Sequence, residues 1–364
     1  MLRIDAAALR RMRLRAQLLH RPPGRTPVDV VHHLVGLQAQ APMAAELGIR
    51  ARSRRNTLEV VNRALAEERS LIRTFAMRGT IHLVAAEDFG WLTELTLAPT
   101  LPSARRRLAE EGVPPRTADR AVGLIEDMLA KEGPLTRPEI GERLRRRRVR
   151  AEGQAVAWLT WLAAAKGVAC FGPTRRGRPT FALVRDWVGP IRPVDRDRAL
   201  GTLAARYLAA YGPALPEDLA SWSGLRAGEV RRAWELVADR LTEVVTDGVT
   251  RWRLKGRRVE APPDVVRLLP MFDAYLLAWR SRDVVLAERH RRKVIPGGGM
   301  IHQALVADGE ILGTWSAKVH GERLRVDIEV FGRVDRSVRL ALAVEADDLG
   351  RFRGLAADHE ISSV

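Results

Sequence analysis

Two glutamines, Gln38 and Gln40, lie two residues apart in the apolar run 34-LVGLQAQAPMAAELGIR-50. On a helix, residues two apart point in directions that differ by about 200°, whereas in an extended strand they point to the same side. Pro42 disfavours helical backbone at the residue before it. We therefore expect a helix that ends near Leu37, followed by an extended Gln-Ala-Gln segment with both amides on one side.

A glutamine amide has no pKa in the working range, so it cannot act as a general base. It can hold a water molecule in place and contact charge that develops in a transition state. The alternative is that both amides only satisfy backbone groups at the end of a helix. The spacing of the two glutamines leaves both interpretations open.

The segment 77-MRGTIHLVAAEDF-89 belongs to the same predicted unit as the glutamines. Gly79 and Thr80 predict a turn between two strands, and His82 alternates outward from the apolar residues on either side of it. His82 is either a hydrogen-bond partner within the strand or a side chain that lines the same cleft as the glutamines.

Residue types that hold metals or phosphates occur without the spacing that such sites need. His32 and His33 are adjacent, so they face different directions on a helix and cannot chelate one metal together. The single cysteine, Cys170, excludes an internal disulfide and a multi-cysteine zinc site. No HExxH or GxxxxGK[ST] pattern occurs, and the run 297-GGG-299 lacks the strand-to-helix context of a dinucleotide loop. We expect no metal and no cofactor.

The chain carries 61 lysines and arginines against 44 acidic residues, which gives a formal net charge of +17. Such a charge favours a polyanion as partner, and nucleic acid is the leading candidate. No run of 18 apolar residues occurs, and the basic start MLRIDAAALRRMRLR has no apolar signal core. We therefore expect a soluble cytoplasmic protein rather than a membrane protein.

Two basic segments are candidates for contact with a phosphate backbone. The segment 289-RHRRK-293 precedes 297-GGG-299 and lies between two predicted strands, where a β-hairpin or loop could reach a groove. The segment 145-RRRRVR-150 precedes a predicted helix at 152–166. For both segments, the alternative is a solvated run of charge.

The elements that position these residues include an internal repeat. The segment 133-GPLTRPEIGERLRRRRV-149 resembles 212-GPALPEDLASWSGLRAG-228, because each begins with Gly-Pro, reaches Pro-Glu and continues into a short apolar-periodic helix. Two short strand-like runs follow each copy. This order is typical of a winged helix-turn-helix. The flanking helices are expected at 118–131 and 152–166 in one copy and at 196–210 and 227–238 in the other.

The N-terminal part fits the same plan, with helices expected at 5–19, 26–38 and 56–69. Two strands joined at Arg78-Gly79 complete this first unit.

After about residue 261, short alternating runs separated by turns are strand-like, and one of them is 337-SVRLALAV-344. They predict a small β-barrel or sandwich at 262–345, closed by a helical end at 346–357. The predicted fold class is α+β, with three tandem winged helix-turn-helix units followed by a C-terminal small β-barrel domain. The expected domains are 1–98, 99–190, 191–261 and 262–364.

Four motifs together resemble the AlkZ/YcaQ-type DNA glycosylases. They are 36-GLQAQAP-42, 77-MRGTIHL-83, 269-LPMFDAYLL-277, and Asp308-Gly309 together with 313-GTW-315. They follow the family's order and span nearly the whole chain, and the Gln-x-Gln form is similar to the AlkZ-like branch. The resemblance implies three tandem winged helices and a C-terminal β-barrel that form a C-shaped clamp on duplex DNA. It also implies that Gln38 and Gln40 are the catalytic pair.

The chemistry of glutamine agrees with such an enzyme. A purine alkylated at N7 is cationic and a good leaving group, so its C1′–N9 bond needs only a placed water and support for an oxocarbenium-like sugar. The expected reaction is hydrolysis of the N-glycosidic bond of N7-alkylated purines in duplex DNA. Because lysine is scarce, no obvious Schiff-base nucleophile is present, which favours a monofunctional DNA glycosylase over a lyase.

The resemblance also suggests an open cleft that accepts bulky adducts or interstrand crosslinks, and a role in self-resistance to a DNA-alkylating natural product. The expected partner is double-stranded DNA containing alkylated purines, bound by a monomer that associates with the nucleoid. The residues expected to contact DNA are Arg78, Thr80, His82, Arg146, Arg148, Arg289, His290, Arg291, Arg292 and Lys293.

The alternative function is a non-enzymatic winged-helix DNA-binding protein or transcriptional regulator, for which three winged units and the net charge would suffice. The large predicted β domain and the absence of an obvious dimerisation helix count against it. RNA binding has no aromatic stacking motif in its favour.

Overall fold

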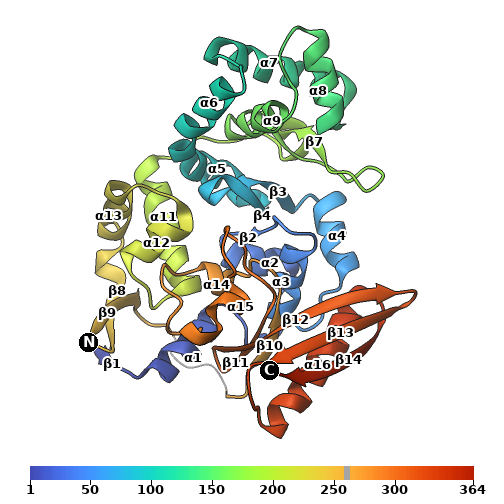
Figure 1. Cartoon of the computed structure of the whole chain (residues 1–364). Helices are drawn as coiled ribbons and strands as arrows, with labels where there is room; N and C mark the ends of the chain where they lie inside the picture. The colour runs from blue at the N-terminus through green and yellow to red at the C-terminus, as the bar shows by residue number, and fades with distance from the viewer. Residues whose placement is uncertain (258–262) are drawn as a thin grey trace.

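Four β-sheets, each with its own helices, make up the computed structural model, which describes residues 1–257 and 263–364. Figure 1 shows a helical unit around α7 (Pro115–Glu132) and α8 (Arg137–Arg146) at one end of the molecule, the elements around β2 (Leu37–Gln38) in the middle and the C-terminal sheet at the other end. The predicted α+β class is confirmed. The predicted boundary between residues 261 and 262 lies outside the described residues.

The sheet that carries the glutamine segment has the strand order β2-β4-β3. The first helix of this unit begins at Pro27, because the Thr26 side chain caps it and Asp29 accepts a hydrogen bond from the Thr26 backbone in return. The elements are α2 (Pro27–His33), β2 (Leu37–Gln38), α3 (Ala44–Arg52), α4 (Leu58–Ala66), β3 (Leu71–Ala76), the 3₁₀ turn η1 (Met77–Gly79) and β4 (Thr80–Ala85).

Helix α2 ends earlier than the sequence predicted. The chain leaves it through left-handed backbone at Val35 (φ 57°) and Gly36 (φ 110°), which a continuing helix cannot contain. Helix α3 follows the glutamine segment and was not predicted. Its N-cap residue, Met43, also has left-handed backbone (φ 58°) and forms no side-chain capping bond, so no ordinary capping residue marks the start of α3.

The second unit repeats this order of helix, short strand, two helices and a hairpin. Its strand order β5-β7-β6 corresponds to β2-β4-β3. The elements from here to the next unit are α5 (Phe89–Leu97), α6 (Leu101–Glu110), α7 (Pro115–Glu132), β5 (Leu135–Thr136), α8 (Arg137–Arg146), α9 (Ala155–Ala165), β6 (Ala169–Phe171), β7 (Thr180–Leu183) and α10 (Val184–Trp187).

The third unit follows the same order, with an isolated bridge from Ala214 to Trp252 in the place of the short strand. The sequence repeat at 133–149 and 212–228 therefore coincides with a structural repeat. The elements are α11 (Arg196–Tyr211), α12 (Pro216–Ser223), α13 (Ala227–Glu235), β8 (Leu241–Thr246) and β9 (Val249–Leu254).

The helix expected at 5–19 is α1 (Ala6–Ala16), and it packs against α11 of the third unit. The strand before it, β1 (Leu2–Arg3), pairs in parallel with β8. The first unit thus uses α2, α3 and α4 as its three helices, and α1 adds to the third unit.

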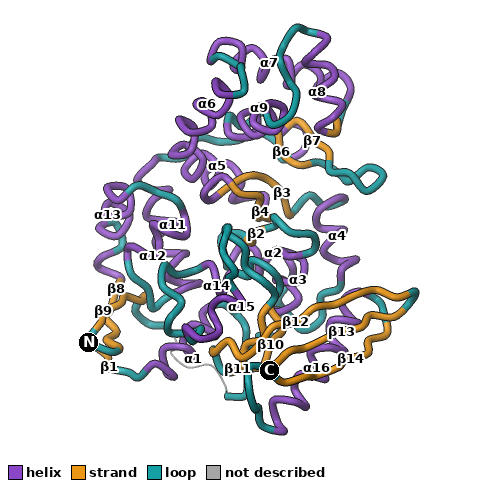
Figure 2. Tube along the Cα trace, in the orientation of Figure 1, coloured by secondary structure: helices purple, strands orange, loops and turns teal. Residues whose placement is uncertain are grey.

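The C-terminal part is an open five-stranded sheet in the order β10-β11-β12-β13-β14, with a long helix packed on it (Figure 2). The predicted small β-barrel is wrong, because β10 and β14 are opposite edges of the described sheet and do not pair with each other. The elements are β10 (Val266–Leu269), α14 (Ala274–Leu277), α15 (Arg291–Val294), β11 (Ala304–Ala307), β12 (Glu310–His320), β13 (Arg323–Val330), α16 (Arg336–Arg353) and β14 (Ala356–Ser363).

The order of helix and strand at the C-terminus also differs from the prediction. The run 337-SVRLALAV-344 lies in α16, where Leu342, Ala346 and Leu349 are buried at helical spacing. The expected helical end at 346–357 is divided between α16 and β14. Because α16 crosses over the sheet, β14 returns parallel to β13.

The first and third units share one apolar core, whereas the second unit has a core of its own. Tyr211 of α11 donates a hydrogen bond to the Leu34 carbonyl at 2.7 Å, and Trp279 donates to the Tyr211 carbonyl at 3.0 Å. The first of these contacts holds α11 against the segment that leads to the glutamines. In the described portion, no helix combines the length and the apolar character needed to cross a bilayer.

Candidate active site

The predicted extended segment is a strand at Leu37–Gln38, and Gln40 lies in the bend that follows it. Strand β2 pairs with β4 so that Gln38 lies opposite His82, and the Ala39 N–H donates to the Ile81 carbonyl at 2.8 Å. Gln38 is half-buried and Gln40 is exposed. The pairing places both glutamines beside the start of β4 and the turn before it.

Both amide oxygens accept a hydrogen bond from residues 78–81. Gln38 Oε1 accepts from Arg78 Nη2 at 3.2 Å, and Gln40 Oε1 accepts from the Ile81 backbone N–H at 3.2 Å. A guanidinium and a backbone N–H can only donate, so these partners determine which amide atom is oxygen. Each oxygen keeps a second lone pair, and neither Nε2 group bonds to another described residue.

Arg78 connects this pair to the third unit. Its Nη1 donates to the carbonyls of Trp222 and of Ser221, the latter at 3.4 Å, at the end of α12. The Arg78 backbone is left-handed (φ 58°), and a Cβ atom at Gly224 would lie 3.2 Å from Arg78 Cγ. Glycine at 224 therefore lets α12 end directly against the arginine.

The turn that carries Arg78 is also held by the second unit. The indole Nε1 of Trp161 in α9 donates to the Gly79 carbonyl at 3.1 Å. Gly79 has φ +74°, and a Cβ atom there would lie 3.3 Å from the same indole nitrogen. The turn is thus fixed from two sides, which gives Gln38 a rigid partner.

His82 is buried, with 3% of its surface exposed. Its Nδ1 lies 3.0 Å from the Thr80 carbonyl, which can only accept, so Nδ1 carries the hydrogen. Burial lowers the pKa of His82 to about 3, and the neighbouring Arg78 adds to that effect. Thr80 itself donates to the Met77 carbonyl at 3.2 Å. Both side chains are engaged within their own hairpin.

Arg282 is a further cation near the turn that the sequence did not single out. Burial lowers the pKa of Arg78, and the charge of Arg282 lowers it further. Arg282 donates to the Leu276 carbonyl at 2.8 Å from a loop before α15. It stands in no basic run or motif, so only the folded chain brings it toward Arg78.

The basic segment 289–293 is helical, and the predicted hairpin or loop at that position is wrong. A 3₁₀ turn (Glu288–His290) leads directly into α15. His290 stacks on Phe331 with ring centroids 4.4 Å apart, and Lys293 lies over the same ring and pairs with Glu329 at 3.7 Å. This stacking fixes the short helix on the end of β13.

Charge in this segment is partly neutralised. Arg291 pairs with Glu288 at 3.1 Å and lines a cavity of about 640 Å³ between α12 and the loop before α15. Arg289 donates to His290 at 3.0 Å, and both Arg289 and Arg292 are exposed. Arg289 and Arg292 are therefore the residues of this segment with most freedom to meet a phosphate.

The second basic segment lies at the end of α8, far from β2 in the view of Figure 1. Arg146 pairs with Glu142 one turn earlier, and Arg148 is exposed with left-handed backbone (φ 58°). The structure therefore does not bring these two arginines together with the glutamines.

Two of the remaining motifs serve the framework of the site. The Asp273 carboxylate accepts one hydrogen bond from Nη1 and one from Nη2 of Arg52, each at 2.8 Å, and Asp273 is also the N-cap of α14. The Tyr275 hydroxyl donates to the Gly309 carbonyl at 2.8 Å, and Trp315 Nε1 donates to the Leu269 carbonyl at 2.7 Å. These bonds tie α3, which follows the glutamines, to the C-terminal sheet.

The described part of the chain shows no other reactive cluster. Within residues 1–257 and 263–364, no group of three or more His, Cys, Asp or Glu side chains is arranged to hold a metal ion. Cys170 is buried, and burial raises the pKa of its thiol to about 12, so it is a core residue and not a nucleophile.

Fold and site together define a DNA glycosylase of the AlkZ-like family. Residues 31–352 match the family described as "DNA glycosylase AlkZ-like", and the chain belongs to it. The resemblance inferred from the four motifs is therefore confirmed, and DNA is the substrate.

Two relatives show how close the similarity is. The chain is 34% identical over 329 residues to the "Interstrand DNA cross-link repair glycosylase" of Streptomyces sahachiroi, across 83% of this chain and 85% of that protein. Its structure is similar to that of Streptomyces sahachiroi DNA glycosylase AlkZ, with a TM-score of 0.81 at 30% identity over 99% of this chain and 100% of that one.

Proposed function

We propose that this chain is a monofunctional DNA glycosylase that hydrolyses the N-glycosidic bond of N7-alkylated purines in duplex DNA. The observation that carries this proposal is the fixed pair of amides. Gln38 Oε1 and Gln40 Oε1 each accept one hydrogen bond at 3.2 Å from residues 78–81. Their second lone pairs can accept the hydrogens of an attacking water and orient it.

The weakness of these groups matches the proposed substrate. An N7-alkylated purine carries a positive charge and leaves readily, so hydrolysis needs no protonation of the base and no strong general base. Glutamine supplies a placed water and a dipole near the sugar as positive charge develops there. Interstrand crosslinks through N7 belong to the same chemical class, and the relative from Streptomyces sahachiroi is named for crosslink repair.

Arg78 acts in this proposal as a positioning residue and not as a DNA contact. Its guanidinium is shared between Gln38 and the Trp222 carbonyl, so it sets the orientation of the amide. His82 and Thr80 are structural, because both bond within the hairpin and His82 is buried. The residues proposed to contact the phosphate backbone of DNA are Arg289 and Arg292. Arg146 and Arg148, at the opposite end of the molecule, are proposed to contact it as well.

The three repeated units support the proposal that the chain grips duplex DNA through winged helix-turn-helix modules. In each unit, a two-stranded hairpin follows the third helix. A short strand pairs with this hairpin in the first two units, and a single bridge does so in the third. A monomer with this many units, associated with the nucleoid, needs no partner subunit to cover a long stretch of duplex.

The test uses duplex oligonucleotides that contain one 7-methylguanine or one bulky N7 adduct. Abasic sites formed by the full chain are cleaved with alkali and counted. We expect Gln38→Ala with Gln40→Ala to lower release by about 100-fold or more, while anisotropy shows unchanged binding to the same duplex. Gln154→Ala, an exposed residue before α9, is the control and should keep full activity.

Full activity in the double variant would overturn the proposed role of the pair. A regulator would instead show one preferred DNA sequence and no base release from either duplex. The two adducts, assayed side by side, also separate a small-lesion enzyme from one that acts on bulky adducts.

A further inference from the structure

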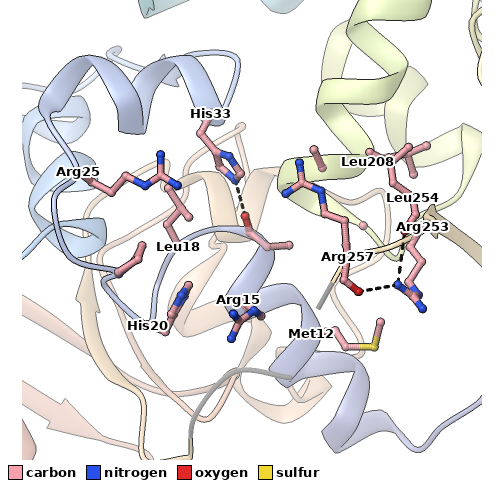
Figure 3. Close-up of a pocket in the computed structure, with 14 residues that line it drawn as sticks. Met12, Arg15, Leu18, His20, Arg25, His33, Leu208, Arg253, Leu254 and Arg257 are labelled. Carbon is pink, nitrogen blue, oxygen red and sulfur yellow. Dashed lines mark hydrogen bonds between the residues drawn. The ribbon is translucent and has the colours of Figure 1, made fainter. Parts of the chain in front are cut away.

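A basic cavity lies between the N-terminal helices and the third unit, and neither glutamine lines it (Figure 3). Its volume is about 420 Å³, and its walls come from α1, the loop that follows it, the end of α2, α11 and β9. No carboxylate of the described residues lines it, and the remaining described lining residues are apolar, glycine or proline. The charged or titratable lining residues are Arg15, His20, Arg25, His33, Arg253 and Arg257.

Among the residues that the structure describes, three of the arginines on its walls pair with no acid. Arg253 donates to the carbonyls of Leu254 at 3.4 Å and of Arg257 at 3.0 Å, and its Nε is buried without a partner. Within the described residues, Arg25, Arg253 and Arg257 form no ion pair. Arg25 acts on the Asp29 carboxylate from a distance, but hydrogen bonds from Thr26 already engage that carboxylate and are the main cause of its lowered pKa.

Two buried arginines elsewhere in the described chain pair with acids, whereas the buried Arg13 donates to the Pro213 carbonyl and lies over the Trp279 ring. Arg21 lies 2.9 Å from both Glu345 and Asp348, and Arg52 forms two bonds to Asp273. Like charges gathered on the walls of one cavity repel each other, and partial burial has removed part of the hydration of Arg257 and lowers its pKa. An anion in the cavity would relieve both costs.

The two histidines are affected both by burial and by the positive charge of the cavity. Burial, followed by the charge of Arg15, lowers the pKa of His20 to about 4, and its Nδ1 is buried without a partner. Burial also lowers the pKa of His33 to about 4, and Arg257 and Arg25 add to that effect. Figure 3 shows the guanidinium of Arg257 directed toward His33 across the cavity.

We propose that this cavity binds a phosphate group, with the guanidinium groups of Arg25, Arg253 and Arg257 as its ligands. The planar guanidinium matches phosphate oxygens with two parallel hydrogen bonds, which favours phosphate over a simple halide. The phosphate comes either from a DNA backbone that reaches the cavity or from a small phosphorylated molecule. In both cases it ties the segment leading to Gln38 to the third unit.

The test is a titration of the full chain with inorganic phosphate at constant ionic strength, followed by calorimetry and by thermal unfolding. We expect saturable binding by the wild type, and a Kd raised about tenfold or more in Arg253→Gln with Arg257→Gln. Arg333→Gln with Arg336→Gln removes the same charge from exposed positions at the start of α16 and should bind as the wild type does. Absence of saturable binding, or an equal loss in both pairs, overturns the proposal.

Competition with a lesion-free duplex distinguishes the two sources of phosphate. Displacement of phosphate by the duplex, with weaker duplex binding in the cavity pair than in the control pair, identifies a backbone phosphate. Retained phosphate and equal duplex binding identify a small molecule. If the cavity pair does not fold by circular dichroism, Arg25→Gln on its exposed loop replaces it, and an unchanged Kd there overturns the proposal.

This inference does not depend on base release. The variant Gln38→Ala with Gln40→Ala should bind phosphate as the wild type does, because neither glutamine lines the cavity. Loss of the proposed catalytic role and loss of the phosphate site would therefore be seen in separate experiments.

Discussion

At the scale of single residues, the site lacks a group that changes charge near neutral pH. Gln38 and Gln40 do not titrate, and burial holds the pKa of His82 at about 3. A histidine with a lowered pKa is neutral at every pH above that value, so it supplies no general acid or base in the physiological range. The reactivity must then come from the substrate.

We predict that the single-turnover rate of 7-methylguanine release is independent of pH between about 5 and 8. His82 stays neutral throughout this window because its pKa of about 3 lies below it. Rates are measured by quenching and alkali cleavage. A profile that rises or falls with an apparent pKa between about 6 and 7 would contradict the proposed mechanism, since it would require a titrating catalytic group.

We predict that Arg78→Met lowers the maximal rate of base release by about 10-fold or more and changes the Kd for duplex DNA little. The substitution removes the donor to Gln38 Oε1 and the bond to the Trp222 carbonyl. Arg78→Lys should restore part of the rate, because it keeps one donor. A raised Kd with an unchanged rate would instead make Arg78 a DNA contact, as the sequence predicted.

At the scale of elements, the turn between β3 and β4 is the part that positions the site. The sequence predicted a turn at Gly79 and Thr80, and the structure has the turn Met77–Gly79 there. Its rigidity comes from Trp161 on one side and from the end of α12 on the other. No local pattern in 77–83 indicates either neighbour.

We predict that Gly79→Ala destabilises the protein more than Gly177→Ala does. The two glycines have φ values of +74° and +73°, so alanine costs each about 1 kcal/mol in backbone strain. Only at Gly79 does the new Cβ atom also meet an indole, 3.3 Å from Trp161 Nε1. Urea unfolding measures the difference, and base release should fall in Gly79→Ala alone. Equal losses would show that Trp161 does not restrain the turn.

At the scale of the whole molecule, a buried cluster of charges joins the first unit to the C-terminal sheet. Arg50 of α3 donates to Glu345 at 3.0 Å, to Asp348 at 3.1 Å and to the Leu268 carbonyl at 2.6 Å. Arg21 pairs with the same two acids. The cluster therefore holds the helix after the glutamines against α16 and β10.

We predict that Arg50→Met lowers the free energy of unfolding by roughly 3–5 kcal/mol, because it removes a fully buried guanidinium that neutralises Glu345 and Asp348 together with Arg21 and that donates to the Leu268 carbonyl. Arg351→Met is the control. Arg351 bonds to Asp348 at 2.7 Å, but its side chain is 40% exposed, so its loss should cost about 1 kcal/mol or less. Urea unfolding gives both values. A small loss in Arg50→Met would show that Arg21 alone satisfies the acids.

Much of the fold followed from local patterns. Thr26 and Pro27 mark the start of α2, and the Gly-Pro repeats at 133 and 212 mark two of the three similar units. The C-terminal part was harder, because a run rich in leucine and alanine such as 337–344 fits a strand or a helix until its burial is known. The sequence therefore predicted the α+β class but misplaced α16 and predicted a barrel where the sheet is open.

The sequence by itself determined what depends on neighbouring residues: the end of the helix and the extended backbone at Gln38 ahead of Pro42, the turn at Gly79 and the excess of positive charge. The tertiary structure decided what each cation does. Arg78 donates to the carbonyl of Trp222, which is 144 residues away in the sequence. The proposed phosphate ligand Arg25 is likewise distant in the sequence from Arg253 and Arg257, which line the same cavity. Such contacts depend on how whole units pack, and no local spacing encodes that packing.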